Sequence, residues 1–178
     1  ASGKTTASKI ISQRRGPLFS ADSVVKKLYT KKIFKQKLAR KLKIKFNFDL
    51  KKTIKREILK NKKNLKILEK IIHPIVRKEM LSFLKKNKKK KFVFLEIPLL
   101  VESKLTRYFD IIIFIQSKKN LRLKRFMRNN RNLKMFNLLN HHQLKDHKKM
   151  RFCDHIVVNN KSLAILKKNL LNIIRFYE

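Results

Sequence analysis

The sequence has a single cysteine and no tryptophan, and no apolar run approaches the roughly 20 residues of a membrane-spanning helix. Cys153 alone cannot form an intrachain disulfide or a structural zinc cluster, so we expect a reducing compartment. The first residues lack the basic-then-apolar pattern of a signal peptide. These features favour a cytoplasmic protein that has no membrane partner.

Acidic residues are also scarce, because 11 Asp and Glu stand against 49 Lys and Arg, which gives a formal net charge of +38. Such a charge attracts polyanions. The lysines are nevertheless spread along the whole chain, and only the segment 85–91 forms a dense block. Most of the 13 phenylalanines occupy core-like positions, so the aromatic platforms that stack bases are not evident. We therefore expect small anionic partners and no specific nucleic acid.

Short apolar runs alternate with amphipathic segments along the chain. Residues 92–97 and 109–115 are rich in β-branched and aromatic side chains, which is typical of buried strands in parallel sheets. A last strand is predicted at 155–158. The alternation predicts an α/β fold with a parallel sheet flanked by helices. Helical spacing of apolar residues predicts helices at 31–85, 118–128, 131–149 and 161–177.

The segment Gly3-Lys4-Thr5-Thr6 opens a predicted helix and matches the second half of the phosphate-loop pattern G-x-x-x-x-G-K-[ST]. In that pattern, backbone N–H groups and a helix N-terminus hold phosphates. We expect the opening glycine and a whole first strand to precede residue 1. So short a match is as typical of an ordinary helix start as of a phosphate loop. In a phosphate loop, Lys4 contacts the β- and γ-phosphates, Thr5 binds Mg²⁺, and Ala1, Ser2, Gly3 and Thr6 supply the surrounding donors.

Further segments follow in an order and spacing that resemble the dephospho-CoA kinase family over essentially the full chain. They are Ser20-Ala21-Asp22, the run from Leu68 through His73-Pro74 to Arg77, the run from Leu95 to Glu102, and the run from Gln143 through Lys149 to Asn159. Ser20 replaces an Asp of the family pattern.

The resemblance implies one P-loop kinase domain that transfers the γ-phosphate of ATP to the 3′-hydroxyl of dephospho-CoA, with Mg²⁺ as cofactor. Its core would comprise residues of about 1–30, 92–124 and 151–178. A helical region of about 31–91 would bind the substrate on its CoA side, and a small helical lid would span about 125–150. The oligomeric state stays open.

The resemblance assigns Asp22 the task of orienting or deprotonating the attacking hydroxyl, while the residue pattern alone also allows a helix N-cap. Pro74 is expected to break or restart a helix just after His73. The resemblance assigns His73 to substrate binding. The residue pattern equally allows a buried histidine at that helix break. Arg77 lies one turn further and is assigned to a substrate phosphate, or is one more exposed base.

Glu96 lies inside an apolar strand, where a carboxylate needs a partner. The resemblance suggests Mg²⁺ through a water, and an ion pair with a lysine is the alternative. Pro98, Leu99 and Glu102 follow this strand and are assigned to the substrate side.

Four arginines, Arg122, Arg125, Arg128 and Arg131, recur at three-residue steps and resemble a lid that closes over ATP. Arg125 is assigned to catalysis and Arg128 to ATP. Asn159 would lie near the adenine, and a plain turn former is the alternative. Two other functions remain open: another small-molecule P-loop kinase of the nucleoside monophosphate kinase type, and a basic nucleic-acid-binding protein without catalysis.

Overall fold

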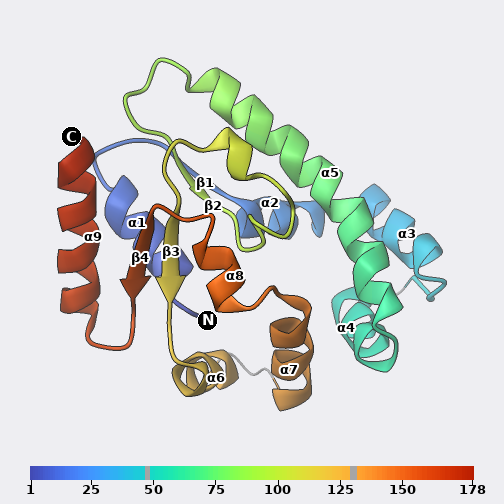
Figure 1. Cartoon of the computed structure of the whole chain (residues 1–178). Coiled ribbons are helices and arrows are strands. Elements are labelled where there is room, and N and C mark those ends of the chain that lie inside the picture. The colour runs from blue at the N-terminus through green and yellow to red at the C-terminus, as the bar shows by residue number, and fades with distance from the viewer. Residues whose placement is uncertain (47–48, 129–131) are drawn as a thin grey trace. The chain divides into compact units, whose positions relative to one another are not determined.

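The computed structural model describes residues 1–46, 49–128 and 132–178. These residues form two compact units (Figure 1). The first unit comprises Ala1–Leu18 and Lys90–Glu178, and the second comprises Phe19–Lys89.

The first unit is built on two parallel strands, β3 (Ile113–Gln116) and β4 (His155–Val158), paired from Ile113 with His155 to Gln116 with Val158. Helix α1 (Lys4–Ser12) packs against α9 (Leu163–Tyr177), and α9 also packs on β4 (Figure 1). Aliphatic and β-branched side chains from all four elements form the core, because each element buries one apolar face. The buried cluster contains Ala7, Ile115, Val157, Leu166 and Leu170.

The remaining elements of the first unit surround this core. Strand β2 (Phe94–Glu96) contacts α1, and the Phe94 N–H donates to the Pro17 carbonyl oxygen at 2.9 Å. Helix α6 (Lys119–Met127) follows β3 and packs on α7 (Leu133–His142), where the Phe126 and Phe136 rings lie 5.5 Å apart. The short elements η1 (Thr106–Tyr108) and α8 (Asp146–Met150) complete the unit, and β1 (Leu18–Ser20) leads from it into the second.

The second unit is helical and contains α2 (Ala21–Leu28), α3 (Lys32–Lys41), α4 (Leu50–Lys60) and the long α5 (Lys63–Lys86). Helices α2, α3 and α4 each pack on α5. Apolar residues at helical spacing supply the buried faces, with Leu38, Leu50 and Met80 almost completely buried.

The predicted α/β class with parallel strands flanked by helices is confirmed, and the last strand, His155–Val158, lies where it was predicted. The predicted strand at 109–115 is displaced, because regular pairing begins only at Ile113. The predicted helix at 131–149 is interrupted: α7 ends at His142 and α8 begins at Asp146.

The prediction that Pro74 breaks a helix is wrong, because α5 runs through it for 24 residues. Proline removes one N–H donor and crowds the preceding turn. The helix nevertheless continues, because its other backbone hydrogen bonds and the packing of three helices against it stabilise the helical conformation.

The second unit contains most of the region of about 31–91 that was expected to be helical. The division of a single kinase domain into three regions stays a prediction. Of the predicted lid, residues 129–131 lie outside the described part of the chain. Across the described ranges, no helix combines the length and the hydropathy needed to cross a bilayer.

Candidate active site

The start of α1 has the geometry of a phosphate-binding helix N-terminus. Gly3 is the N-cap with φ 99° and ψ 17°, a left-handed conformation that favours glycine. Gly3 has no side chain with which to cap this end, and the first N–H groups of an α-helix lack intrahelical partners, as in helix N-termini that bind anions. Lys4 is half-buried beside them, with its Nζ 3.5 Å from Ser2 Oγ. Ala1, Thr5 and Thr6 are exposed at the same end.

Asn159 follows β4 and is buried against this loop, with 7% of its surface exposed. Its side-chain Nδ2 donates to the Ser2 carbonyl oxygen at 2.8 Å, and its backbone N–H donates to the Gln116 carbonyl oxygen at 2.8 Å. A Cβ atom at Gly3 would lie 2.2 Å from Asn159 Nδ2, so a larger residue at position 3 would displace this amide. The structure therefore brings Asn159 to the loop and excludes the interpretation of a plain turn former.

Thr5 and Glu96, the two residues predicted to bind Mg²⁺, contact each other. The Thr5 hydroxyl donates to Glu96 Oε1. Glu96 is 5% exposed, so its carboxylate gains from a hydrogen-bond donor. A hydroxyl and a carboxylate are oxygen ligands of the kind that hard cations prefer. Within the described ranges no cluster of three or more His, Cys, Asp or Glu side chains is found, so a cation here would need ligands from a nucleotide or water.

Arg125 of α6 is anchored at the carboxyl ends of the two parallel strands. Its Nη1 donates to Ser117 Oγ and its Nη2 to the Asn159 carbonyl oxygen, both at 3.2 Å. Ser117 is buried and also donates to the Asn159 carbonyl oxygen, at 3.1 Å. Arg128 is the C-cap residue that follows α6 and is exposed. Arg131 lies outside the described residues.

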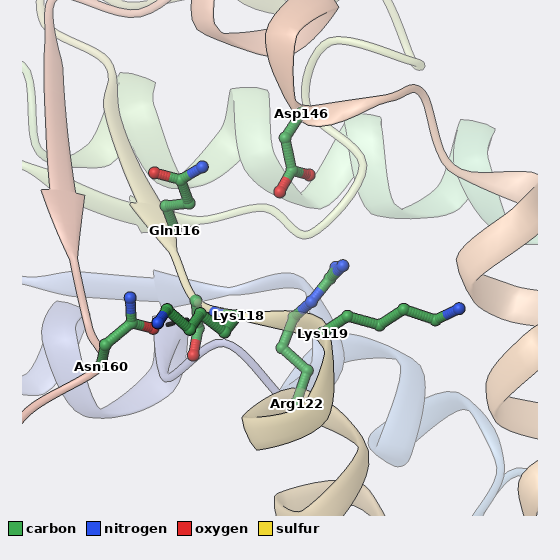
Figure 2. A pocket seen from close by; sticks show the side chains of 7 residues that line it. Gln116, Lys118, Lys119, Arg122, Asp146 and Asn160 are labelled. Carbon is green, nitrogen blue, oxygen red and sulfur yellow. Dashed lines mark hydrogen bonds between the residues drawn. The ribbon is translucent and has the colours of Figure 1, made fainter.

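A pocket of about 420 Å³ opens next to these strand ends (Figure 2). Figure 2 shows the Asp146 carboxylate directed from the start of α8 toward Arg122, and Lys119 beside Arg122 on α6. Among the described side chains, Arg122 Nε is a buried nitrogen without a hydrogen-bond partner. The pocket is therefore lined by several cationic side chains, with the Asp146 carboxylate as the one acidic group among the described lining residues. Its lining comprises Gln116, Ser117, Lys118, Lys119, Arg122, Asp146 and Asn160.

Glu102 takes part in a partly buried ion pair. Its Oε1 lies 2.9 Å from Lys149 Nζ and accepts the Leu144 N–H at 3.1 Å. Lys149 is 7% exposed and also donates to Gln143 Oε1 at 3.1 Å. The carboxylate therefore ties the turn after β2 to the segment that joins α7 and α8. Pro98 and Leu99 belong to the same turn and are half-buried.

The other predicted site residues lie in the second unit. Asp22 is exposed in the first turn of α2, and the N-cap of that helix is Ser20, whose Oγ accepts the Ser23 N–H at 3.4 Å. The alternative in which Asp22 serves as the cap is therefore wrong. His73 is half-buried on α5, and Arg77 is exposed one turn further along it.

Sequence reasoning missed Ser117 and the pairing of Lys149 with Glu102. The sequence did contain a signal for each: Ser117 is a small polar residue directly after a predicted strand, and Lys149 is a motif lysine in a mostly exposed helical segment.

Burial and the nearby Asp154 carboxylate raise the pKa of the Cys153 thiol above its ordinary value of 9.0, although Lys149 lowers it in part. This thiol is therefore protonated at neutral pH and is a poor nucleophile there.

The sequence model of the dephospho-CoA kinase family matches residues 1–164. The dephospho-CoA kinase of Bartonella henselae is 32% identical over 98% of this chain and 92% of its own length. That of Rickettsia conorii is 27% identical over 100% of this chain and 93% of its own length.

Two solved structures are similar to this one. Dephospho-CoA kinase from Campylobacter jejuni has a TM-score of 0.65 and 26% identity, with 98% of this chain and 91% of that chain covered. TT1252 from Thermus thermophilus has a TM-score of 0.75 at 22% identity, with 98% and 92% covered, and it supports the fold alone. The predicted P-loop fold is thereby confirmed. As the family resemblance predicted, the chain belongs to the dephospho-CoA kinase family of ATP-dependent kinases.

Proposed function

We propose that residues 1–6, together with Glu96 and Asp22, transfer the γ-phosphate of ATP to the 3′-hydroxyl of dephospho-CoA, giving coenzyme A and ADP. The observation that carries this proposal is the left-handed N-cap at Gly3, which opens α1 toward an anion and has Lys4 and Thr5 directly after it. Phosphoryl transfer requires mainly positioning and charge stabilisation, and a helix N-terminus with a lysine supplies both.

The nucleotide phosphates are held by the first N–H groups of α1 and by the Lys4 ammonium. Its amine lies 3.5 Å from Ser2 Oγ, a loose contact that a phosphate oxygen can replace. The side chains of Thr5 and Thr6 are exposed at the same helix end, and so is Ala1 of the loop. The strong positive charge of the chain attracts both anionic substrates.

The contact between Thr5 and Glu96 fits a magnesium ion, because both oxygens are of the hard type that Mg²⁺ takes. Thr5 would bind the ion and Glu96 would orient it, directly or through a water. When bound, Mg²⁺ neutralises charge on the β- and γ-phosphates. The buried carboxylate also keeps the Thr5 hydroxyl pointed in one direction.

Asp22 is proposed as the residue that orients the 3′-hydroxyl and accepts its proton. It is exposed, and Ser20 already caps the helix, so its carboxylate is not required as the helix cap. A carboxylate in the first turn of α2 interacts favourably with the helix dipole, which fits its place there.

The remaining substrate contacts are proposed for His73 and Arg77, one turn apart on α5, and for Pro98, Leu99 and Glu102 of the turn after β2. Arg77 is exposed and suits a pyrophosphate oxygen as a bidentate donor. Glu102 acts through its ion pair with Lys149, which holds the turn in place.

Arg125 is proposed to stabilise charge on the transferred phosphoryl group, and Arg128 to contact ATP. The anchoring of Arg125 at the strand ends places its guanidinium next to Asn159, which contacts the phosphate loop. We also propose the cytoplasm as the location, because ATP is available there and the single thiol suits a reducing compartment.

A coupled assay of ADP release tests this function, with ATP, Mg²⁺ and dephospho-CoA as reactants. ADP release should require dephospho-CoA and should fall about 10²- to 10⁴-fold in Asp22→Ala, the range for loss of a general base. Asp49→Ala is the matched control, since Asp49 is also exposed beside a helix start in the second unit.

Other outcomes of the assay would favour the other two functions. ADP release with a nucleoside monophosphate but not with dephospho-CoA would point to a different P-loop kinase. No turnover with any acceptor, together with salt-sensitive binding of random oligonucleotides that survives Lys4→Ala, would point to a nucleic-acid-binding protein.

A further inference from the structure

We propose that Asn159 is a positioning residue that orients the peptide bond between Ser2 and Gly3, so that the Gly3 N–H faces the phosphates of the nucleotide. This inference deepens the proposed function and rests on it. It depends on three observations: the amide donor at Ser2, the left-handed backbone of Gly3, and the anchoring of Asn159 from β3.

The geometry of a trans peptide gives the direction of the Gly3 N–H. In a planar trans peptide the C=O and the N–H point in opposite directions. Asn159 Nδ2 holds the Ser2 carbonyl oxygen at 2.8 Å. The N–H of the same peptide, which belongs to Gly3, therefore points away from Asn159. That side is the open N-terminus of α1, where the anion would bind.

Such a constraint matters because Gly3 is conformationally permissive. A glycine populates φ values of either sign at little cost, so the peptide before it can rotate and carry its N–H away from a ligand. Gly3 also lets the amide approach closely, since a Cβ there would lie 2.2 Å from Asn159 Nδ2. Because Gly3 has no side chain, its backbone needs to be held in place, and the Asn159 amide has room to approach and hold it.

Asn159 is itself held firmly. Its backbone N–H donates to the Gln116 carbonyl oxygen at 2.8 Å, which extends the parallel pairing of β3 and β4. Its carbonyl oxygen accepts from Ser117 Oγ and Arg125 Nη2. These contacts use backbone atoms of Asn159, whereas the loop contact uses its side chain. A substitution can therefore release the loop while the anchor of Arg125 remains.

This separation predicts a particular kinetic pattern for Asn159→Asp, in which a carboxylate replaces the donor and faces the Ser2 carbonyl oxygen. The KM for ATP should rise about tenfold or more, as expected when one charge-assisted contact to phosphate is lost. The kcat at saturating ATP should change less than threefold. Asn87→Asp is the matched control: Asn87 Nδ2 also donates to a backbone carbonyl oxygen, that of Phe83, at 2.8 Å, but in the second unit.

The chain also permits a direct readout, because it contains only two glycines, Gly3 and Gly16. Labelling with ¹⁵N-glycine gives one amide signal from each in an NMR correlation spectrum. Gly16 is the internal control, since its N–H donates to the Ser12 carbonyl oxygen at 3.2 Å, at the far end of α1. In the wild-type chain, ADP with Mg²⁺ should shift the Gly3 signal. In Asn159→Asp, the Gly3 signal should move or broaden before ADP is added, and the Gly16 signal should stay in place.

The outcomes distinguish this inference from the function on which it rests. A Gly3 signal that ADP does not move in the wild-type chain would overturn the proposed function and this inference with it. A normal wild-type response that is unchanged in Asn159→Asp, with an unchanged KM for ATP, would overturn the inference alone. If Asn159→Asp does not fold, as judged from the Gly16 signal, Asn159→Ala takes its place under the same criteria.

Discussion

The Thr5 hydroxyl donates a hydrogen bond to the Glu96 carboxylate, although 91 positions separate the two residues in the sequence. The contact joins the first turn of α1 to the last residue of β2. Glu96 is 5% exposed, so its carboxylate needs hydrogen-bond donors such as this one. The two residues predicted to bind Mg²⁺ thus lie together beside the phosphate loop.

Glu96→Gln should weaken the use of Mg²⁺ while it preserves the packing of β2. Glutamine has the shape of glutamate and can still accept the Thr5 hydrogen, but it lacks the charge that attracts the cation. The Mg²⁺ concentration that gives half-maximal ADP release should rise about 10- to 100-fold. A Mg²⁺ titration measures this, with the exposed Glu79→Gln as control. An unchanged titration curve would show that Glu96 does not contribute to Mg²⁺ binding.

Gly3→Ala should damage the loop in two ways. Alanine at φ 99° is strained by about 1–2 kcal/mol, and its Cβ would lie 2.2 Å from Asn159 Nδ2. Displacing that amide should lower kcat/KM for ATP about 100-fold, as for loss of a preorganised donor. Steady-state kinetics and ADP binding report this. Lys9→Ala, an exposed change on the same helix, should leave both close to wild type.

Ser20→Ala and Asp22→Asn should act on different properties. Ser20 caps α2, so its loss should reduce the free energy of unfolding by about 1 kcal/mol with little change in kcat. Asp22→Asn should cost at most about 1 kcal/mol of unfolding free energy through the helix dipole, yet lower kcat about 10²-fold or more. Urea unfolding and steady-state kinetics measure the two effects. The reverse pattern would make Asp22 structural.

Lys149→Met should destabilise the first unit strongly. Glu102 Oε1 and Lys149 Nζ are 2.9 Å apart, with side chains only 16% and 8% exposed, so removal of the lysine leaves a largely buried carboxylate without its counter-charge. The expected loss of unfolding free energy is about 3–5 kcal/mol. The double variant Glu102→Gln/Lys149→Met should recover part of it. Denaturant unfolding of the two variants tests the pair, and equal losses would show that the lysine acts through packing alone.

Cys153 should react slowly in the native protein. Burial and the Asp154 carboxylate raise its thiol pKa above the ordinary 9.0. Because the thiolate forms less readily in the folded state than in the unfolded state, the associated stability is present below pH 9 and decreases as the pH rises through the folded pKa. Iodoacetamide alkylation in native buffer should reach half its maximal rate at a higher pH than in urea. Coinciding pH profiles would contradict the shift.

Local patterns were sufficient for much of the fold. The run His155-Ile156-Val157-Val158 predicts its strand because β-branched residues favour extended structure, which is a local property of the run. The spacing of apolar residues likewise predicts the closing helix, which begins at Leu163. Pro74 shows the limit of such patterns, since a proline usually ends a helix but the packing of neighbouring helices on α5 carries this one through.

Residues close together in the chain account for the helix start at Gly3-Lys4-Thr5, for the strand and helix periodicity and for the order of motifs. These features could therefore be predicted from local patterns. Three contacts follow from the folded chain and not from any local pattern: Asn159 binds the Ser2 carbonyl oxygen, Thr5 donates to Glu96, and Lys149 pairs with Glu102. A buried amide or carboxylate needs a hydrogen-bond partner, and this requirement can be predicted from the sequence. Which partner meets it depends on the path of the chain through space.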